Sequence, residues 1–242
     1  MMMSLSEVKF STAVRKQVKW KLRSFSQALL TLIFLQLFFT MLTMDSTSSF
    51  GTSNSFFELS IKSFTLDLIL IITCIWGLIT GLLISTKAYR FDDLAIVASR
   101  TTSSVANSIV LVIFSAFGTF TIFAAFYIQV ARLSLFGDKA IIYETHSMTL
   151  DTILFCFSLL LLSTAIGYVI PISFSSFRNG VGLLLAALVC VRIIRYLFRQ
   201  STGTTTFMAI SSPGMLAMIF SVCSLILLAL ATLAVSKSEV LR

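Results

Sequence analysis

The chain has 242 residues, of which 57% are hydrophobic and only 12% are charged, and its mean hydropathy is +0.98. An average soluble domain carries about 25% charged residues, so this sequence has too few polar side chains to cover a water-soluble fold. A net charge of +8 would suit nucleic acid in a soluble chain. Here the Lys and Arg residues gather at the ends of apolar runs, where they orient loops and contact anionic headgroups. Composition therefore excludes an ordinary soluble domain and predicts a helical membrane protein.

Residues 1–26 are polar and basic, and they are predicted to form a cytoplasmic amphipathic helix on the membrane surface. Apolar residues recur at steps of three and four, and basic residues recur at steps of four on another face. The apolar run that follows is too long for a signal peptide and lacks a small-residue cleavage site, so no cleavage is expected. The apolar positions are Val14, Val18, Leu22, Phe25 and Leu29, and the basic residues are Lys9, Arg15, Lys16, Lys19, Lys21 and Arg23.

Residues 27–242 contain six apolar segments, and each is predicted to cross the membrane as a helix. Their lengths suit a hydrocarbon core of roughly 30 Å at about 1.5 Å per residue. The fifth segment is the weakest, because Arg192 and Arg195 interrupt it. The fold class is therefore all-α, a polytopic membrane protein with about six transmembrane helices after the amphipathic helix. The segments are 28–44, 64–84, 105–130, 150–172, 180–198 and 215–235.

The distribution of positive charge predicts that both termini are cytoplasmic. With the N-terminus inside, twelve of the 18 Lys and Arg residues fall on the cytoplasmic side. The exception is Arg192, Arg195 and Arg199, which this topology places outside. Either these side chains snorkel outward from one stripe of a short helix, or the fifth segment is partly re-entrant. We expect them to line a pathway or to lie at the outer leaflet.

Motifs for enzymatic chemistry are missing from the sequence. It contains no G-x-x-x-x-G-K-[ST], H-E-x-x-H or G-x-S-x-G, so we expect no catalytic, cofactor or metal site in this chain. The single His146 falls in a predicted outer loop, and the cysteines, in four different apolar runs, show no C-x-x-C spacing. Asp45, Asp67 and Asp151 stand at segment ends, whereas a proton-coupled carrier usually buries an ionisable group near mid-span. The cysteines are Cys74, Cys156, Cys190 and Cys223.

Glycine and proline give local signals. Gly77 and Gly81 form a G-x-x-x-G pair that lets two helix backbones approach closely, either inside the chain or at a dimer seam. Pro171 and Pro213 are predicted to mark segment boundaries. Residues 45–64 are rich in Ser, Thr and Asn and are predicted to be a flexible outer loop.

The predicted cytoplasmic loop after the second segment, residues 85–100, mixes aromatic side chains with both signs of charge. This composition suits docking on another protein, and a short apolar face follows it. The alternative is a simple amphipathic loop at the lipid surface. The aromatic and charged residues are Tyr89, Arg90, Phe91, Asp92 and Asp93, and the apolar ones are Leu94, Val97 and Ala98.

The order of these features resembles the membrane subunits of bacterial ABC-2 type transporters. In that family this loop often reads R-x-x-E-L-L-x-x-x-P-x-S-R before the third span. Here Arg90, Asp93-Leu94 and Ser99-Arg100 match, whereas Ala98 stands near the usual proline. The family often carries two half-membrane helices between spans five and six, where this chain has only the short stretch 200–214.

The resemblance implies a plasma-membrane permease subunit of an ATP-driven exporter of a peptide, lipid or drug-like amphiphile. Two such subunits, identical or related, would form the pathway, and separate ATPase subunits would bind ATP and Mg²⁺. Three alternatives stay open: a non-transporting anchor or assembly protein, a secondary carrier or channel, and an intramembrane enzyme. The residues that would contact the ATPase are Tyr89, Arg90, Phe91, Asp92, Asp93 and Arg100.

Overall fold

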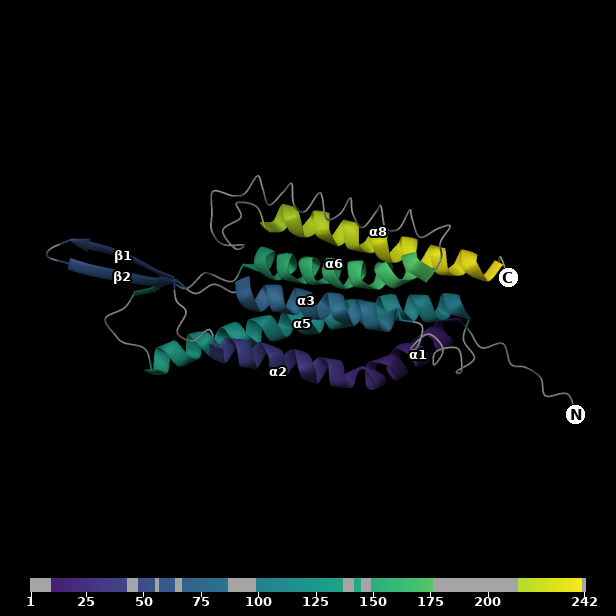
Figure 1. Cartoon of the computed structure of the whole chain (residues 1–242), viewed down its shortest axis with the longest axis horizontal. Coiled ribbons are helices and arrows are strands. Elements are labelled where there is room, and N and C mark those ends of the chain that lie inside the picture. The colour runs from purple at the N-terminus through teal and green to yellow at the C-terminus, as the bar shows by residue number, and fades with distance from the viewer. Residues whose placement is uncertain are drawn as a thin grey trace, which may run out of the picture.

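The computed structural model describes residues 10–42, 48–54, 57–63, 67–86, 99–136, 142–144, 149–175 and 213–240. Six helices fall in these ranges and lie alongside one another in an elongated bundle (Figure 1). They are α1 (Phe10–Ser24), α2 (Ser26–Leu42), α3 (Asp67–Ile84), α5 (Arg100–Phe136), α6 (Leu150–Ser175) and α8 (Pro213–Val240).

Three of these helices are long and apolar enough to cross a membrane by themselves. They are Thr101–Arg132 of α5, Leu150–Ser173 of α6 and Pro213–Val235 of α8. The pair α1 and α2 makes a fourth candidate if it counts as one broken span, and the apolar part of α3, Leu68–Ile84, is shorter. The described residues thus contain three or four candidate spans instead of about six. The predicted fifth segment, 180–198, lies outside them.

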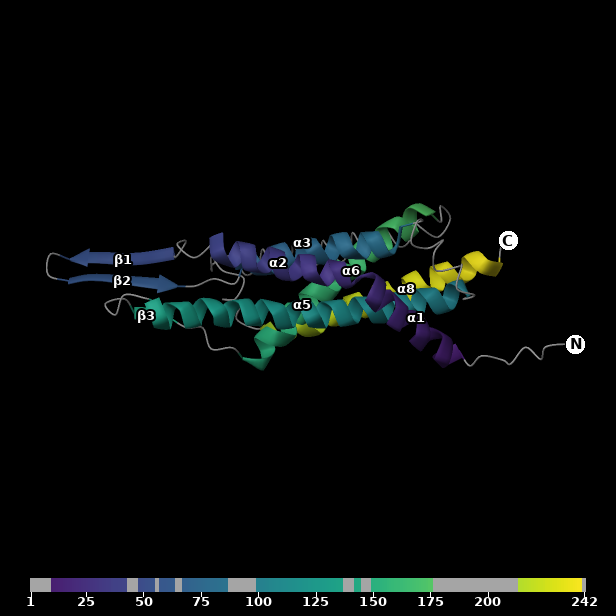
Figure 2. The same cartoon turned by 90° about the horizontal axis from the view of Figure 1, so that it is seen from below.

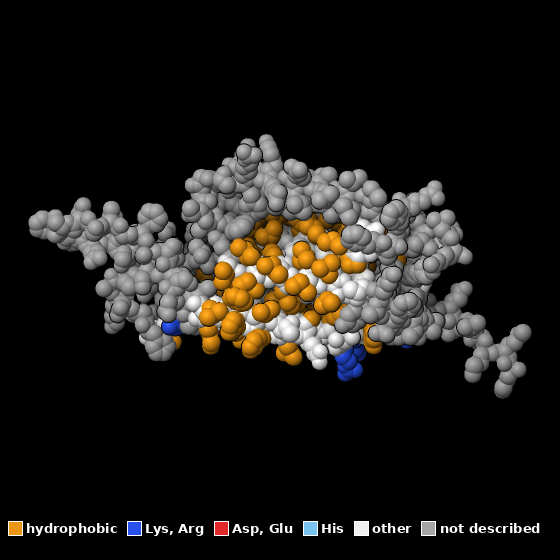
Figure 3. All heavy atoms as spheres, in the orientation of Figure 1, with side chains coloured by type: hydrophobic (Ala, Val, Ile, Leu, Met, Phe, Trp, Pro, Cys, Tyr) orange, Lys and Arg blue, Asp and Glu red, His pale blue; other side chains and the backbone are white. Residues whose placement is uncertain are grey.

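Large apolar side chains cover the outside of the bundle, while part of the inside is polar. On α2, Phe34 is 70% exposed and Met41 67%, whereas the inward Gln36 and Thr40 are buried. The space-filling view shows apolar side chains spread over the middle of one face, with basic side chains near the ends of the bundle (Figure 3). This arrangement is unfavourable in water and favourable in hydrocarbon, where the polar groups must find partners inside the protein.

Helix α6 lies at the centre of the bundle and packs against α3, α5 and α8. Its contact with α3 is a backbone contact, because both helices present glycine there. A Cβ added to Gly81 would lie 2.3 Å from the Thr164 carbonyl oxygen, and one added to Gly167 would lie 2.2 Å from the Leu78 carbonyl oxygen. Ser163 Oγ also donates a hydrogen bond of 2.6 Å to the Cys74 carbonyl oxygen. The face that contains Gly77 and Gly81 is therefore occupied within the chain.

Helices α6 and α8 begin at the same end of the bundle and run side by side (Figure 1). The Asp151 carboxylate, in the first turn of α6, lies close to Gly214 in the first turn of α8. A negative charge is favourable beside the amino end of a helix. α6 therefore ends at the opposite end of the bundle from the start of α8.

A small sheet lies beyond the end of the bundle at which α3 and α6 begin (Figures 1 and 2). Strands β1 (Ser48–Asn54) and β2 (Phe57–Ser63) are antiparallel, with Ser48 opposite Ser63, and β3 (Ile142–Glu144) is parallel to β2. The sequence predicted a flexible loop here. The Ser- and Thr-rich residues instead satisfy their backbone hydrogen bonds in a hairpin, so the all-α description holds for the bundle and not for this end.

The two prolines behave differently. Pro213 begins α8, as predicted, because its missing N–H has no partner to lose in the first turn. Pro171 lies inside α6, which continues to Ser175, so the predicted boundary was wrong at this position. Membrane helices tolerate proline where neighbouring helices and hydroxyl side chains satisfy the freed backbone groups.

Replacing Gly81 with Ala is expected to destabilise the bundle by about 1–3 kcal/mol, because the new methyl group meets backbone atoms that cannot turn aside. The thermal unfolding midpoint of purified protein in detergent measures the effect. Gly118→Ala is the matched control, since its methyl group would meet only side chains, the nearest being the end of Leu160 at 2.6 Å. Equal midpoints for the two variants would contradict the backbone contact.

Candidate functional site: a buried lysine between α1 and α5

The Lys21 side chain enters the bundle from α1 and is only 2% exposed. Its ammonium group donates to Ser103 Oγ at 3.1 Å, to the Ser103 carbonyl oxygen at 3.5 Å and to Asn107 Oδ1. An ammonium group has three donors, and these three acceptors match that number. Among the residues whose burial the structure describes, Lys21 is the only charged side chain that is buried.

The polar cluster continues from α5 to α6. Asn107 Nδ2 donates to Tyr168 Oη at 3.4 Å, and the Tyr168 hydroxyl lies 3.1 Å from Ser104 Oγ. Tyr168 is fully enclosed, and its own backbone lies beside Gly81 of α3. The Lys21 cluster, which we define as Lys21, Ser103, Ser104, Asn107 and Tyr168, therefore connects α1, α5 and α6 near the end of the bundle at which α5 begins.

Further along the bundle the buried polar side chains occur as separate pairs. Ser115 Oγ and Thr164 Oγ1 are 3.3 Å apart between α5 and α6, and Gln36 donates to Thr73 at 2.9 Å between α2 and α3. Hydrogen bonds of this kind join membrane helices at roughly 0.6–2 kcal/mol each. These pairs lack a charged member, which sets the Lys21 cluster apart.

The local sequence places Lys21 inward through a bend between α1 and α2. The helices meet at 47° around Phe25, which Ser24 and Ser26 flank. The Phe25 ring packs edge-on against Phe114 of α5, with centroids 6.5 Å apart. Because of this bend, α1 does not continue along the axis of α2, and it lies against α5 (Figure 2). Burying a cation costs several kcal/mol unless its partners recover it, and here Ser103 and Asn107 supply such partners.

Two further buried atoms in this part of the fold have no hydrogen-bond partner. They are Gln17 Oε1, one turn before Lys21 on α1, and Ser85 Oγ, just after the end of α3. An unpaired buried polar atom costs about 1–3 kcal/mol. The inner face of α1 thus combines a buried charge with an unsatisfied acceptor.

The structure describes only some of the residues selected from the sequence. Tyr89, Arg90, Phe91, Asp92 and Asp93 lie outside the described residues, and so do Arg192, Arg195 and Arg199. Arg100 is the first residue of α5. Ser99 caps that helix, since its Oγ accepts a hydrogen bond of 3.2 Å from the Thr102 N–H. Ser99 and Arg100 therefore lie at the start of the helix whose Ser103 and Asn107 accept hydrogen bonds from Lys21.

Sequence reasoning missed the role of Lys21, which it counted among the basic residues of a surface helix. The buried positions of α1 are Val14, Gln17 and Lys21, and Phe25 follows them. This spacing of three and four was visible in the sequence, and it places Lys21 on the same stripe as Val14 and Phe25. Of the predicted apolar positions, Val18 and Leu22 are only partly buried.

Metal binding finds no support in the described ranges, where His, Cys, Asp and Glu do not gather in groups of three or more. Comparison of the chain with protein-family models, with curated proteins and with solved structures found no match.

Replacing Asn107 with Leu removes an acceptor from Lys21, and we expect a loss of about 2–4 kcal/mol in stability. The same substitution in a Lys21→Met background is expected to cost less than about 1 kcal/mol, because no buried charge is then left without its acceptor. Unfolding of the four proteins of this double-mutant cycle in detergent measures the coupling. Ser115→Ala, at a distant polar pair, is the control and should show the same cost in both backgrounds. Additive effects of Asn107→Leu and Lys21→Met would contradict the contact.

Proposed function

We propose that this protein is the membrane subunit of an ATP-driven exporter and that it forms a translocation pathway with a second membrane subunit. Separate ATPase subunits bind ATP and Mg²⁺ and supply the energy. The cargo class is a peptide, lipid or drug-like amphiphile, which suits a bundle with this much apolar side-chain surface. The sequence supports this proposal through the loop at 85–100 and through the absence of catalytic motifs.

The structural observation that supports the proposal is the Lys21 contact between α1 and the first two turns of α5. A membrane subunit needs an element that carries the movement of its ATPase into the spans. The loop that contains Arg90 and Asp93 ends at the Ser99 cap of α5, and Lys21 connects that end to α1. A displacement of the loop therefore moves α1 and α5 together, and Tyr168 passes it to α6.

A secondary carrier is the second candidate, and Lys21 is the observation that favours it. Carriers driven by protons bury an ionisable side chain, and this chain buries one. Lys21 lies near the start of α5, whereas such groups usually lie near mid-span. Export that persists when the proton gradient is collapsed and stops when ATP is depleted favours the exporter; the reverse favours the carrier.

Cysteine labelling in intact cells tests the orientation, in a chain whose four native cysteines are replaced with Ala. Ser99 and Thr149 are exposed and lie at the starts of α5 and α6, at opposite ends of the bundle. We expect an impermeant maleimide to label Thr149→Cys from outside, and Ser99→Cys only after permeabilisation. The reason is that the end of the bundle where α1 and α5 begin carries the exposed Lys and Arg residues of α1, and such an end is expected to face the cytoplasm. Labelling of both sites, or of Ser99→Cys alone, would contradict this topology.

Charge reversal in the loop tests the ATPase contact. We expect Arg90→Glu or Asp93→Lys to reduce the amount of ATPase that copurifies in mild detergent by at least about tenfold, because like charges then meet across the contact. Lys62→Glu, at the predicted outer side, is the matched reversal and should leave copurification unchanged. All three proteins should insert into the membrane in equal amounts. An unchanged complex in the Arg90 and Asp93 variants would overturn the role of the loop.

A further inference from the structure

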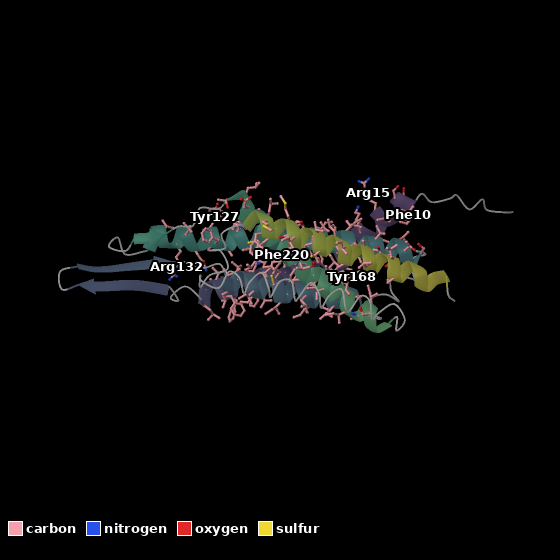
Figure 4. All side chains as sticks on the ribbon, turned by 90° about the horizontal axis from the view of Figure 1, so that it is seen from above. Phe10, Arg15, Tyr127, Arg132, Tyr168 and Phe220 are labelled. Atoms are coloured by element: carbon pink, nitrogen blue, oxygen red, sulfur yellow. The ribbon has the colours of Figure 1, made fainter. Side chains whose placement is uncertain are left out.

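The two faces of helix α1 differ in exposure: one packs on α5 and the other is open. The inner face packs on α5 with Lys21 buried, and the outer face exposes a second group of cations and aromatic rings. Phe10 is 55% exposed and Trp20 38%, and Figure 4 shows Phe10 and Arg15 at the outer edge of the bundle. The exposed cations are Arg15, Lys16, Lys19 and Arg23.

We propose that α1 moves between a docked position, with Lys21 buried against Ser103 and Asn107, and a second position flat on an anionic lipid surface, and that anionic headgroups favour the second. A lipid shifts such an equilibrium only if it binds one position better. The four exposed cations are available in both positions. Lys21 supplies the difference, since only the undocked helix presents it to headgroup phosphates as a fifth cation.

The inner face of the docked α1 is not fully satisfied. It contains the unpartnered Gln17 Oε1, which lowers the stability of the contact with α5. On the lipid surface the remaining inner residues, Val14, Val18 and Leu22, are apolar and enter the acyl boundary. Val18 and Leu22 are only partly buried in the docked position, so the lipid surface covers them further, and the two positions also differ in the partner of Lys21.

The bend at Phe25 supplies the hinge. The backbone N–H of Phe25 donates to the Lys21 carbonyl oxygen at 2.9 Å, as in a regular α-helix. The N–H of Ala28 donates to the Phe25 carbonyl oxygen at 3.0 Å, an i→i−3 bond that tightens the turn after Phe25. Packing of Phe25 on Phe114 fixes the hinge to α5. α1 therefore rotates about a fixed point while α2 keeps its place, through Gln36 and Thr73, against α3.

The distance between spin labels at Thr12→Cys on α1 and Ser99→Cys before α5 tests the proposal, in the full chain without its native cysteines. Both positions are exposed. In nanodiscs of phosphatidylcholine alone we expect one short distance. With about one-third phosphatidylglycerol we expect a longer distance whose population rises about fivefold, the effect of bringing one further cation to an anionic surface. An unchanged distance distribution in the two lipid mixtures would overturn the proposal.

Lys21→Met is the decisive variant, and Lys19→Met is its matched control. The first is expected to keep the short distance in both lipid mixtures, because it removes the charge that favours undocking. The second removes a cation that is exposed in either position, so most of the lipid-dependent shift should persist. If Lys21→Met fails to give monodisperse protein, Lys21→Gln replaces it, with the same expectation. A lipid response of Lys21→Met equal to that of the native chain, or one lost equally in Lys19→Met, would overturn the proposal.

Discussion

The backbones of α3 and α6 touch over a short distance, and the rest of the bundle is arranged around that contact. Gly77 and Gly81 on one helix and Gly167 on the other leave no room for a side chain. In hydrocarbon the hydrophobic effect does not hold helices together, so close packing and interhelical hydrogen bonds must do so. The glycine contact places α6 at the centre, where it also packs on α5 and α8. Tyr168 extends from this contact to the polar cluster of α5.

The Lys21 cluster holds a charged side chain inside the bundle, where it has hydrogen-bond partners that lipid could not supply. A buried cation is expensive, but its hydrogen bonds are directional, and they fix α1 in one register on Ser103 and Asn107. The cost of burial and the specificity of the contact therefore have the same origin.

The position of the cluster connects structure with the proposed function. It lies near the end of the bundle where α1 and α5 begin. The Ser99 cap of α5 and the exposed basic face of α1 are both at this end. The proposed ATPase contact and the proposed lipid response both act at this end, the first through the docked Lys21 and the second by releasing it. Both proposals thus rest on the Lys21 contact.

The sequence by itself determined the membrane class, because that depends on composition and on the length of apolar runs. It also predicted α2, α5, α6 and α8 near their observed places and marked Gly77 and Gly81 as a packing face, since these signals are local. Local periodicity alone did not reveal which partner Gly81 meets, which acceptors on α5 bind Lys21, or that residues 48–54 and 57–63 pair as strands. Those features depend on residues far apart in the chain, such as Lys21 and Asn107 or Gly81 and Thr164, whose proximity only the tertiary structure decides.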